Sequence, residues 1–224
     1  MTGARRAAAT LAWVAVFALA FALVEASVVI YLRALYYPEG FAFPLKLIPG
    51  GYLRVEIARE AATIIMLSTI GIIAGWKPWE RFGFFLFAFG VWDIAFYAWL
   101  FFTVGWPGSL LDWDILFLIP LPWIGPVIAP VAISLLMTVC GAMAVLRSAG
   151  ERRFLPGALS WALGILGTAF ILYSFMTDTD AGIRGALPAP YHYGLLVAGL
   201  IAYVAGFVFA CRRARHLPGA PDPS

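Results

Sequence analysis

Seven ionisable residues lie within or beside hydrophobic segments that are long enough to cross a membrane. They are Glu25, Arg33, Arg54, Glu56, Arg59, Glu60 and Asp93. A charged side chain at the centre of a bilayer costs at least about 2.5–3.5 kcal/mol on insertion scales. Such groups therefore face the protein interior, pair with one another or line a pathway. Four carboxylates and three arginines in this setting could exchange protons, hold a cation or clasp helices together.

These residues are expected to converge on one polar site. Counting 1.5 Å per helical residue from the expected outer ends of their spans, Glu25 and Asp93 lie roughly 16 Å deep. Arg59 and Glu60 lie roughly 9–10 Å deep on the second span. Glu56 and Glu60 are four residues apart and share a helix face, so their carboxylates repel unless an arginine, a proton or a metal cation lies between them. A surplus of carboxylates in a low-dielectric site suits proton exchange or cation capture.

Three further candidates lie in loops that are expected on the outer side, namely Asp112, Asp114 and His192. The two aspartates add to the negative excess of the cluster. A zinc site that joins His192 to such carboxylates is chemically acceptable, but no ligand spacing supports it. His192 is better explained as an interfacial residue, since amphipathic rings favour that depth. The sequence has no evident cofactor motif, and a cation held by carboxylates stays open as an alternative.

The composition indicates a membrane protein. Of the 224 residues, 63% are hydrophobic and 12% are charged, whereas soluble domains are nearer half apolar and a quarter charged. The net charge of +3 does not indicate nucleic-acid binding, because the arginines gather at span ends rather than along one soluble face. The lipid bilayer is the expected partner. A homo-oligomer and a larger membrane complex both remain open.

Hydrophobic runs of about 20 residues predict an all-α integral membrane bundle of six helices in a single domain over residues 1–224. The expected spans cover residues 8–36, 53–74, 81–104, 126–146, 156–176 and 191–211. Small residues recur every four positions on the last two spans, at Ser160, Gly164 and Thr168 on the fifth and at Ala198, Ala202, Gly206 and Ala210 on the sixth. Small residues at this spacing let helices approach closely, so we expect the last two spans to pack as a pair.

An irregular segment separates the third and fourth spans. Ser109 and Asp112 match a capping box, which predicts a short outer or re-entrant helix that runs to about Ile119. Interior prolines remove helix hydrogen bonds and clash with the preceding turn. Such prolines follow at Pro120, Pro122, Pro126 and Pro130. We therefore expect no continuous helix from Leu110 to Leu146.

The basic residues predict the orientation. Ten of them fall on one set of loops and ends, namely Arg5, Arg6, Lys77, Arg81, Arg147, Arg152, Arg153, Arg212, Arg213 and Arg215. The opposite loops hold Glu39, Lys46, Asp112, Asp114, Asp178, Asp180 and Arg184. Under the positive-inside rule, we expect an integral protein of a bacterial-type inner membrane with both termini in the cytoplasm.

The cluster supports three functional hypotheses. The first is a small proton- or cation-coupled transporter or ion-binding protein, with Pro120–Pro130 as a gate. The second is a membrane-embedded, metal-dependent enzyme that acts on a lipid at the outer leaflet. The third is a non-catalytic subunit of a membrane complex. Ion pairs that merely hold the first three spans together would explain the same charges.

Overall fold

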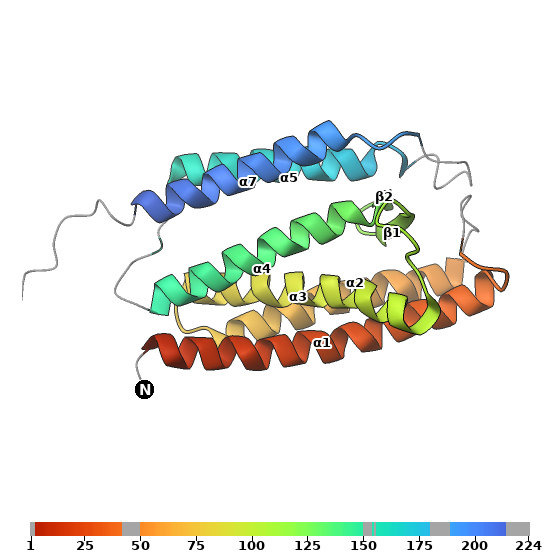
Figure 1. The fold of residues 1–224 in the computed structure, drawn as a ribbon, viewed down its shortest axis with the longest axis horizontal. Helices are drawn as coiled ribbons and strands as arrows, with labels where there is room; N and C mark the ends of the chain where they lie inside the picture. Colours follow the sequence, from red (N-terminus) through yellow and green to blue (C-terminus); the bar gives the residue numbers. More distant parts are fainter. Residues whose placement is uncertain (1–2, 42–49, 150–153, 155, 180–188, 214–224) are drawn as a thin grey trace, which may run out of the picture.

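The computed structural model (Figure 1) describes residues 3–41, 50–149, 154, 156–179 and 189–213. Within these ranges, six helices are long and apolar enough to cross a membrane. The helices lie alongside one another, with the start of the first and the end of the last at the same end of the bundle (Figure 1). The chain is thus a multi-pass helical membrane protein.

The helices are α1 (Gly3–Tyr36), α2 (Gly50–Ala74), α3 (Pro78–Val104), α4 (Ile128–Ala149), α5 (Ala158–Met176) and α7 (Tyr193–Arg213). Two strands, β1 (Trp113–Phe117) and β2 (Trp123–Pro126), precede α4. Each predicted span coincides with one helix, and the ends differ by at most five residues. We call the end that carries the strands the hairpin end, and the end where α1 begins and α7 finishes the terminal end.

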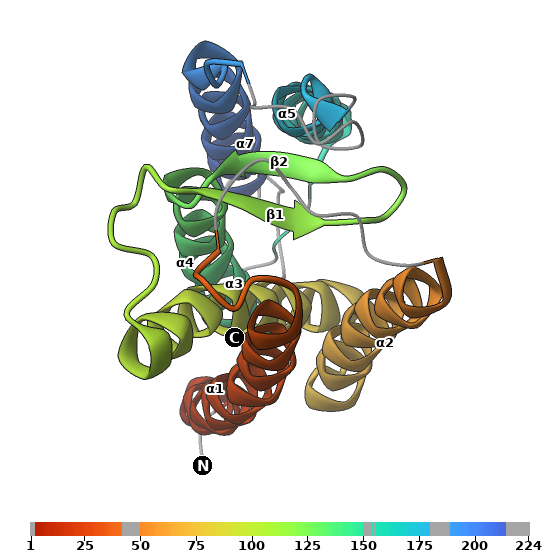
Figure 2. The ribbon, with the colours of Figure 1, turned by 90° about the vertical axis from the view of Figure 1, so that its right-hand side faces the viewer.

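The predicted short helix before the fourth span is wrong, because β1 and β2 form an antiparallel hairpin there. Asp114 lies opposite Gly125 and Ile115 opposite Ile124, with a bulge after Ile115. The predicted break in the helix is confirmed, since α4 begins only at Ile128. In the end-on view, the hairpin lies between the α5–α7 pair and the helices α1 and α2 (Figure 2).

Local chemistry explains why a hairpin forms. The capping residues do make a turn, in which the Asp112 carboxylate accepts hydrogen bonds from the N–H groups of Gly108 and Ser109 at 2.8 and 3.1 Å. The chain that follows is rich in aromatic and β-branched residues, which fit a strand. Pro120 and Pro122 then lie between the strands, where a helix could not continue. Pairing between the strands satisfies backbone groups that lipid would leave unsatisfied.

Helix α3 is the centre of the bundle, because it packs against α1, α2 and α4. Its start is fixed by the Glu80 carboxylate, which accepts the N–H groups of Trp76 and Lys77 at 3.0 and 3.2 Å. Small residues bring α3 close to α4. A Cβ added at Gly141 would lie 2.6 Å from the carbonyl oxygen of Gly83. This close packing of α3 against α4, which we call the α3–α4 seam, fixes the position of α3, the helix that carries Asp93.

Helices α5 and α7 pack as a pair, as predicted. Gly206 lies against Ser160, where an added Cβ would be 3.1 Å from the serine carbonyl oxygen. A tighter approach occurs at Gly167 and Gly199, which the four-residue spacing did not single out. None of these residues lines the cavity described below.

The orientation remains an expectation. Several residues on which it depends lie outside the described residues: Lys46, Arg152, Arg153, Asp180, Arg184 and Arg215. Of the basic residues that are described, Arg6 and Lys77 lie at the terminal end, in a cavity lined by the first turns of α1 and the connection between α2 and α3.

Candidate functional site

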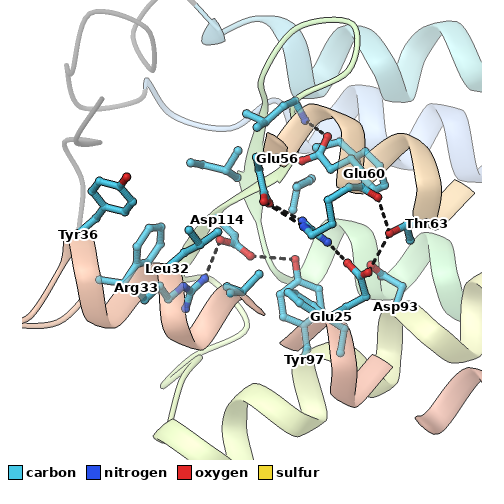
Figure 3. Close-up of a pocket in the computed structure, with 18 of the residues that line it drawn as sticks. Glu25, Leu32, Arg33, Tyr36, Glu56, Glu60, Thr63, Asp93, Tyr97 and Asp114 are labelled. Atoms are coloured by element: carbon cyan, nitrogen blue, oxygen red, sulfur yellow. Dashed lines mark hydrogen bonds and ion pairs between the residues drawn. The ribbon is translucent and has the colours of Figure 1, made fainter. Parts of the chain in front are cut away.

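A cavity of about 140 Å³ lies between α1, α2, α3 and β1 near the hairpin end, and we call it the acidic cavity. In Figure 3, the carboxylates of Glu25, Glu56, Glu60, Asp93 and Asp114 surround this space and come from α1, α2, α3 and β1. The charged residues of its lining are Glu25, Arg33, Glu56, Arg59, Glu60, Asp93 and Asp114. Three carboxylates are thus in excess over the two guanidinium groups.

Arg59 is the central cation of the cavity. Its guanidinium group forms ion pairs with Glu25 of α1 and with Glu56 of its own helix. The Nε–H group of Arg59 donates to Glu56 at 3.0 Å, and the hydroxyl of Thr63 donates to Glu25 at 2.9 Å. Side-chain exposure is only 6% for Glu25 and 12% for Glu56, so water screens these pairs weakly. The Arg59–Glu25 ion pair and the Thr63–Glu25 hydrogen bond connect α2 to α1.

Glu60 and Asp93 are held differently. The backbone N–H of Leu118, just after β1, donates to the Glu60 carboxylate at 2.8 Å. The hydroxyl of Ser134 on α4 donates to Asp93 at 2.8 Å. Neither carboxylate forms an ion pair within the part of the chain that the structure describes.

A second cation lies nearer the hairpin end. Arg33 forms an ion pair with Asp114 of β1 at 3.0 Å, and Tyr97 donates to the other carboxylate oxygen at 3.2 Å. The Arg33 guanidinium lies 4.1 Å from the ring centre of Phe41 and 3.8 Å from that of Trp106. Aromatic faces attract a cation, so they hold Arg33 over the cavity beside β1.

Burial raises the pKa of Asp114 to about 6, from 3.8, although Arg33 opposes the shift. The folded state therefore binds a proton more tightly than the unfolded chain, and this group makes the protein less stable as the pH rises from about 4 to 6. A difference of two pKa units corresponds to about 2–3 kcal/mol. We expect the Asp114→Asn variant in detergent to show a shallower fall in thermal midpoint across this interval.

The matched control for this measurement is Glu39→Gln, because Glu39 is an exposed carboxylate just beyond the end of α1. This variant should keep the wild-type dependence of thermal midpoint on pH. Equal slopes for Asp114→Asn and the wild type would contradict the assignment of the shift to Asp114.

Three sequence candidates are not brought to the cavity. Arg54 is exposed, because at about 100° per residue it lies on the face of α2 opposite Glu56 and Glu60. Asp112 caps the turn at Gly108 instead. His192 is exposed at the start of α7 and does not line the cavity.

The structure adds residues that the sequence analysis did not select. Tyr97 and Trp92 line the cavity, and Ser134 supports Asp93 from α4. Tyr97 could have been found, since it lies four residues after Asp93 and shares its helix face. The N–H group of Leu118 could not have been selected from the sequence. It donates to Glu60 because the pairing of β1 with β2 ends at Phe117.

Two buried donors beside the cavity are also informative. Among the described residues, neither Nη1 of Arg33 nor Nε1 of Trp92 has a hydrogen-bond partner, and Trp92 is 5% exposed. Buried donors normally have protein or water partners. A water molecule needs only about 10–15 Å³, so the cavity is large enough for several.

Among the described residues, no three His, Cys, Asp or Glu side chains are close enough together to hold one metal ion directly. No family model matches the chain, and no curated protein or solved structure is significantly similar to it. A functional assignment thus rests on the geometry of the cavity.

Proposed function

We propose that the protein is a small proton- or cation-coupled transporter whose binding site is the acidic cavity. The observation that carries the proposal is the pair Glu60 and Asp93, two carboxylates that line the cavity and form no direct ion pair among the described residues. An isolated buried charge is strongly unfavourable. A proton or a small cation would neutralise each of these groups.

The other charges support this role. Arg59 and Arg33 each form their direct ion pairs with other carboxylates of the cavity, namely Glu25, Glu56 and Asp114. At about 140 Å³, the cavity is smaller than the roughly 300–1,000 Å³ of pockets for larger organic ligands. Protons, water and a small cation match this size.

The same observations give less support to an enzyme that acts on a lipid. The acidic cavity is small for a lipid headgroup, and the described carboxylates do not converge on a single metal position. A role as a subunit of a larger complex is supported by no feature of the cavity.

The proposal is tested by the response of thermal stability to ligands. In detergent, the midpoint of the wild type should rise with added Na⁺, K⁺ or Mg²⁺, or as the pH falls from about 8 to 5, because a ligand bound by the folded state stabilises it. Choline chloride at equal ionic strength controls for screening. We expect the variants Glu60→Gln and Asp93→Asn, which resemble neutralised carboxyls, to lose part of this response.

The exposed carboxylate variant Glu39→Gln should respond as the wild type does. A full wild-type response in the double variant Glu60→Gln/Asp93→Asn would show that protons or cations bind elsewhere. Absence of any response in the wild type would leave only the structural role of the ion pairs.

A further inference from the structure

A second cavity, of about 520 Å³, lies at the terminal end, and we call it the terminal cavity. It is lined by α1, α2, α3 and α4, which include the three helices that line the acidic cavity. Its polar lining consists of Arg6, Thr10, Lys77 and Glu80. The unit formed by α1, α2 and α3 therefore has a cavity with polar side chains at each of its two ends.

Apolar side chains separate the two cavities. Between the lining residues of one cavity and those of the other lie Ala18, Phe21, Ala22, Leu67 and Ala88, which we call the septum. Phe21 is 8% exposed, and the other four side chains are fully buried. Phe21 also stacks on Trp92, which lines the acidic cavity. One continuous apolar cluster thus closes the space between the cavities.

The septum is thin. On α1 the cavities are separated by the stretch from Glu25 to Phe17, and on α2 by the stretch from Thr63 to Ile70. These stretches correspond to roughly 10–12 Å of helix, whereas the hydrocarbon core of a bilayer is about 30 Å thick. The barrier to a proton or a cation is therefore concentrated in about one-third of the crossing.

Helix α2 is the part of this unit with the least apolar attachment. Its buried side chains are Glu60, Thr63 and Leu67, so Leu67 is its one buried hydrophobic side chain in the described structure. At the hairpin end, α2 is joined to the bundle by the pairing of Arg59 with Glu25 and by the hydrogen bond from Leu118 to Glu60. The second contact involves Glu60, one of the two carboxylates that a proton or a cation would neutralise.

We propose that the two cavities are the two ends of one route through α1, α2 and α3, closed here by the septum. Protons or the small cation bound in the acidic cavity then pass Phe21 and Leu67 when α2 moves relative to α1. The inference rests on the proposed function for the nature of the permeant species. In the conformation described here, the acidic cavity lies near the hairpin end and the septum separates it from the terminal cavity.

Cysteine labelling along α1 tests the route. In a background with Cys140→Ala and Cys211→Ala, single cysteines are placed at Val29 in the acidic cavity, Phe21 in the septum and Thr10 in the terminal cavity. A charged, membrane-impermeant thiol reagent is applied separately to each side of the membrane. We expect Val29→Cys to react from the hairpin side only, Thr10→Cys from the terminal side only, and Phe21→Cys from neither.

The control for labelling is Val24→Cys, because Val24 is 59% exposed on the outer surface of α1 next to Glu25. Lipid should protect it from the reagent. Reaction of Phe21→Cys at the rate of Val29→Cys would overturn the septum, and reaction of Val29→Cys from the terminal side would overturn the closed route.

Proton leak provides a second measurement. In liposomes that contain a pH-sensitive dye and carry an imposed membrane potential, Leu67→Ala should increase proton flux several-fold over the wild type, because it opens the septum. Ile65→Ala, at a 64% exposed position of the same helix, should leave the flux unchanged. Equal flux in the two variants would overturn the role of Leu67.

Cysteine labelling and proton leak test the route and do not test the proposed binding site. A normal labelling pattern combined with no effect of Glu60→Gln on the cation response would refute the proposed binding site and keep the route. A cation response that depends on Glu60, together with free labelling of Phe21→Cys, would refute the route and keep the site.

Discussion

Replacement of Arg59 by methionine is expected to destabilise the protein by about 3–5 kcal/mol, the usual cost of leaving buried charges without their partner. Arg59 pairs with both Glu25 and Glu56, so its loss leaves two carboxylates unpaired in a cavity that already holds an excess of them. Unfolding in mixed detergent micelles, followed by circular dichroism, would measure the change in the free energy of unfolding.

The triple variant Glu25→Gln/Glu56→Gln/Arg59→Met should regain most of the lost stability, because it removes all three charges together. The control is Arg54→Met, five residues earlier on the exposed face of α2, for which a change within about 0.5 kcal/mol is expected. Equal stability of Arg59→Met and Arg54→Met would mean that the ion pairs do not hold α2 in place.

This result also separates the structural role of the cluster from its proposed binding role. Rescue in the triple variant would show that Arg59, Glu25 and Glu56 act as a clasp between α1 and α2. It would not remove the case for a binding site, which rests on Glu60 and Asp93.

Replacement of Gly141 by alanine is expected to cost about 3 kcal/mol, at the upper end of overpacking effects. An added Cβ would lie 2.6 Å from the carbonyl oxygen of Gly83 and 2.6 Å from the backbone nitrogen of Phe87. These are backbone atoms of α3, so α3 and α4 would have to move apart. The thermal midpoint and the free energy of unfolding in detergent would both report the loss.

Gly164→Ala on α5 is the matched control, because a Cβ there meets nothing within 4 Å. In a helix, alanine is about 1 kcal/mol more favourable than glycine, so this variant should be as stable as the wild type or slightly more stable. If Gly141→Ala behaves in the same way, the α3–α4 seam is looser than described and cannot support the cavity.

Six helical spans could be predicted because the hydrophobicity of about 20 consecutive residues is a local property of the chain. The charged group could be identified for a related reason, since Glu25, Arg59 and Asp93 stand out within apolar windows. Prolines 120 to 130 likewise excluded a continuous helix through their missing N–H groups. These conclusions required no knowledge of which helices are neighbours.

The partners of each charge depended on packing between distant segments. Arg33 and Asp114 are 81 positions apart in the chain and meet only because the segment after the Asp112 turn forms a hairpin over the bundle end. The capping pattern of Ser109 and Asp112 predicted a helix there, but the turn that these residues form can be followed by a helix or by a strand. Strand pairing, which is a non-local interaction, selected the hairpin.

Arg54 and Arg59 also show the difference between what the sequence indicates and what packing decides. Both lie near the hairpin end of α2 and looked equivalent in composition, but only Arg59 is on the face that turns toward α1 and α3. Likewise, the septum consists of ordinary apolar residues such as Phe21 and Leu67, whose sequence context resembles that of any buried helix position. Their place between two cavities follows from how α1, α2 and α3 pack together, because a cavity is a property of several helices and of none alone.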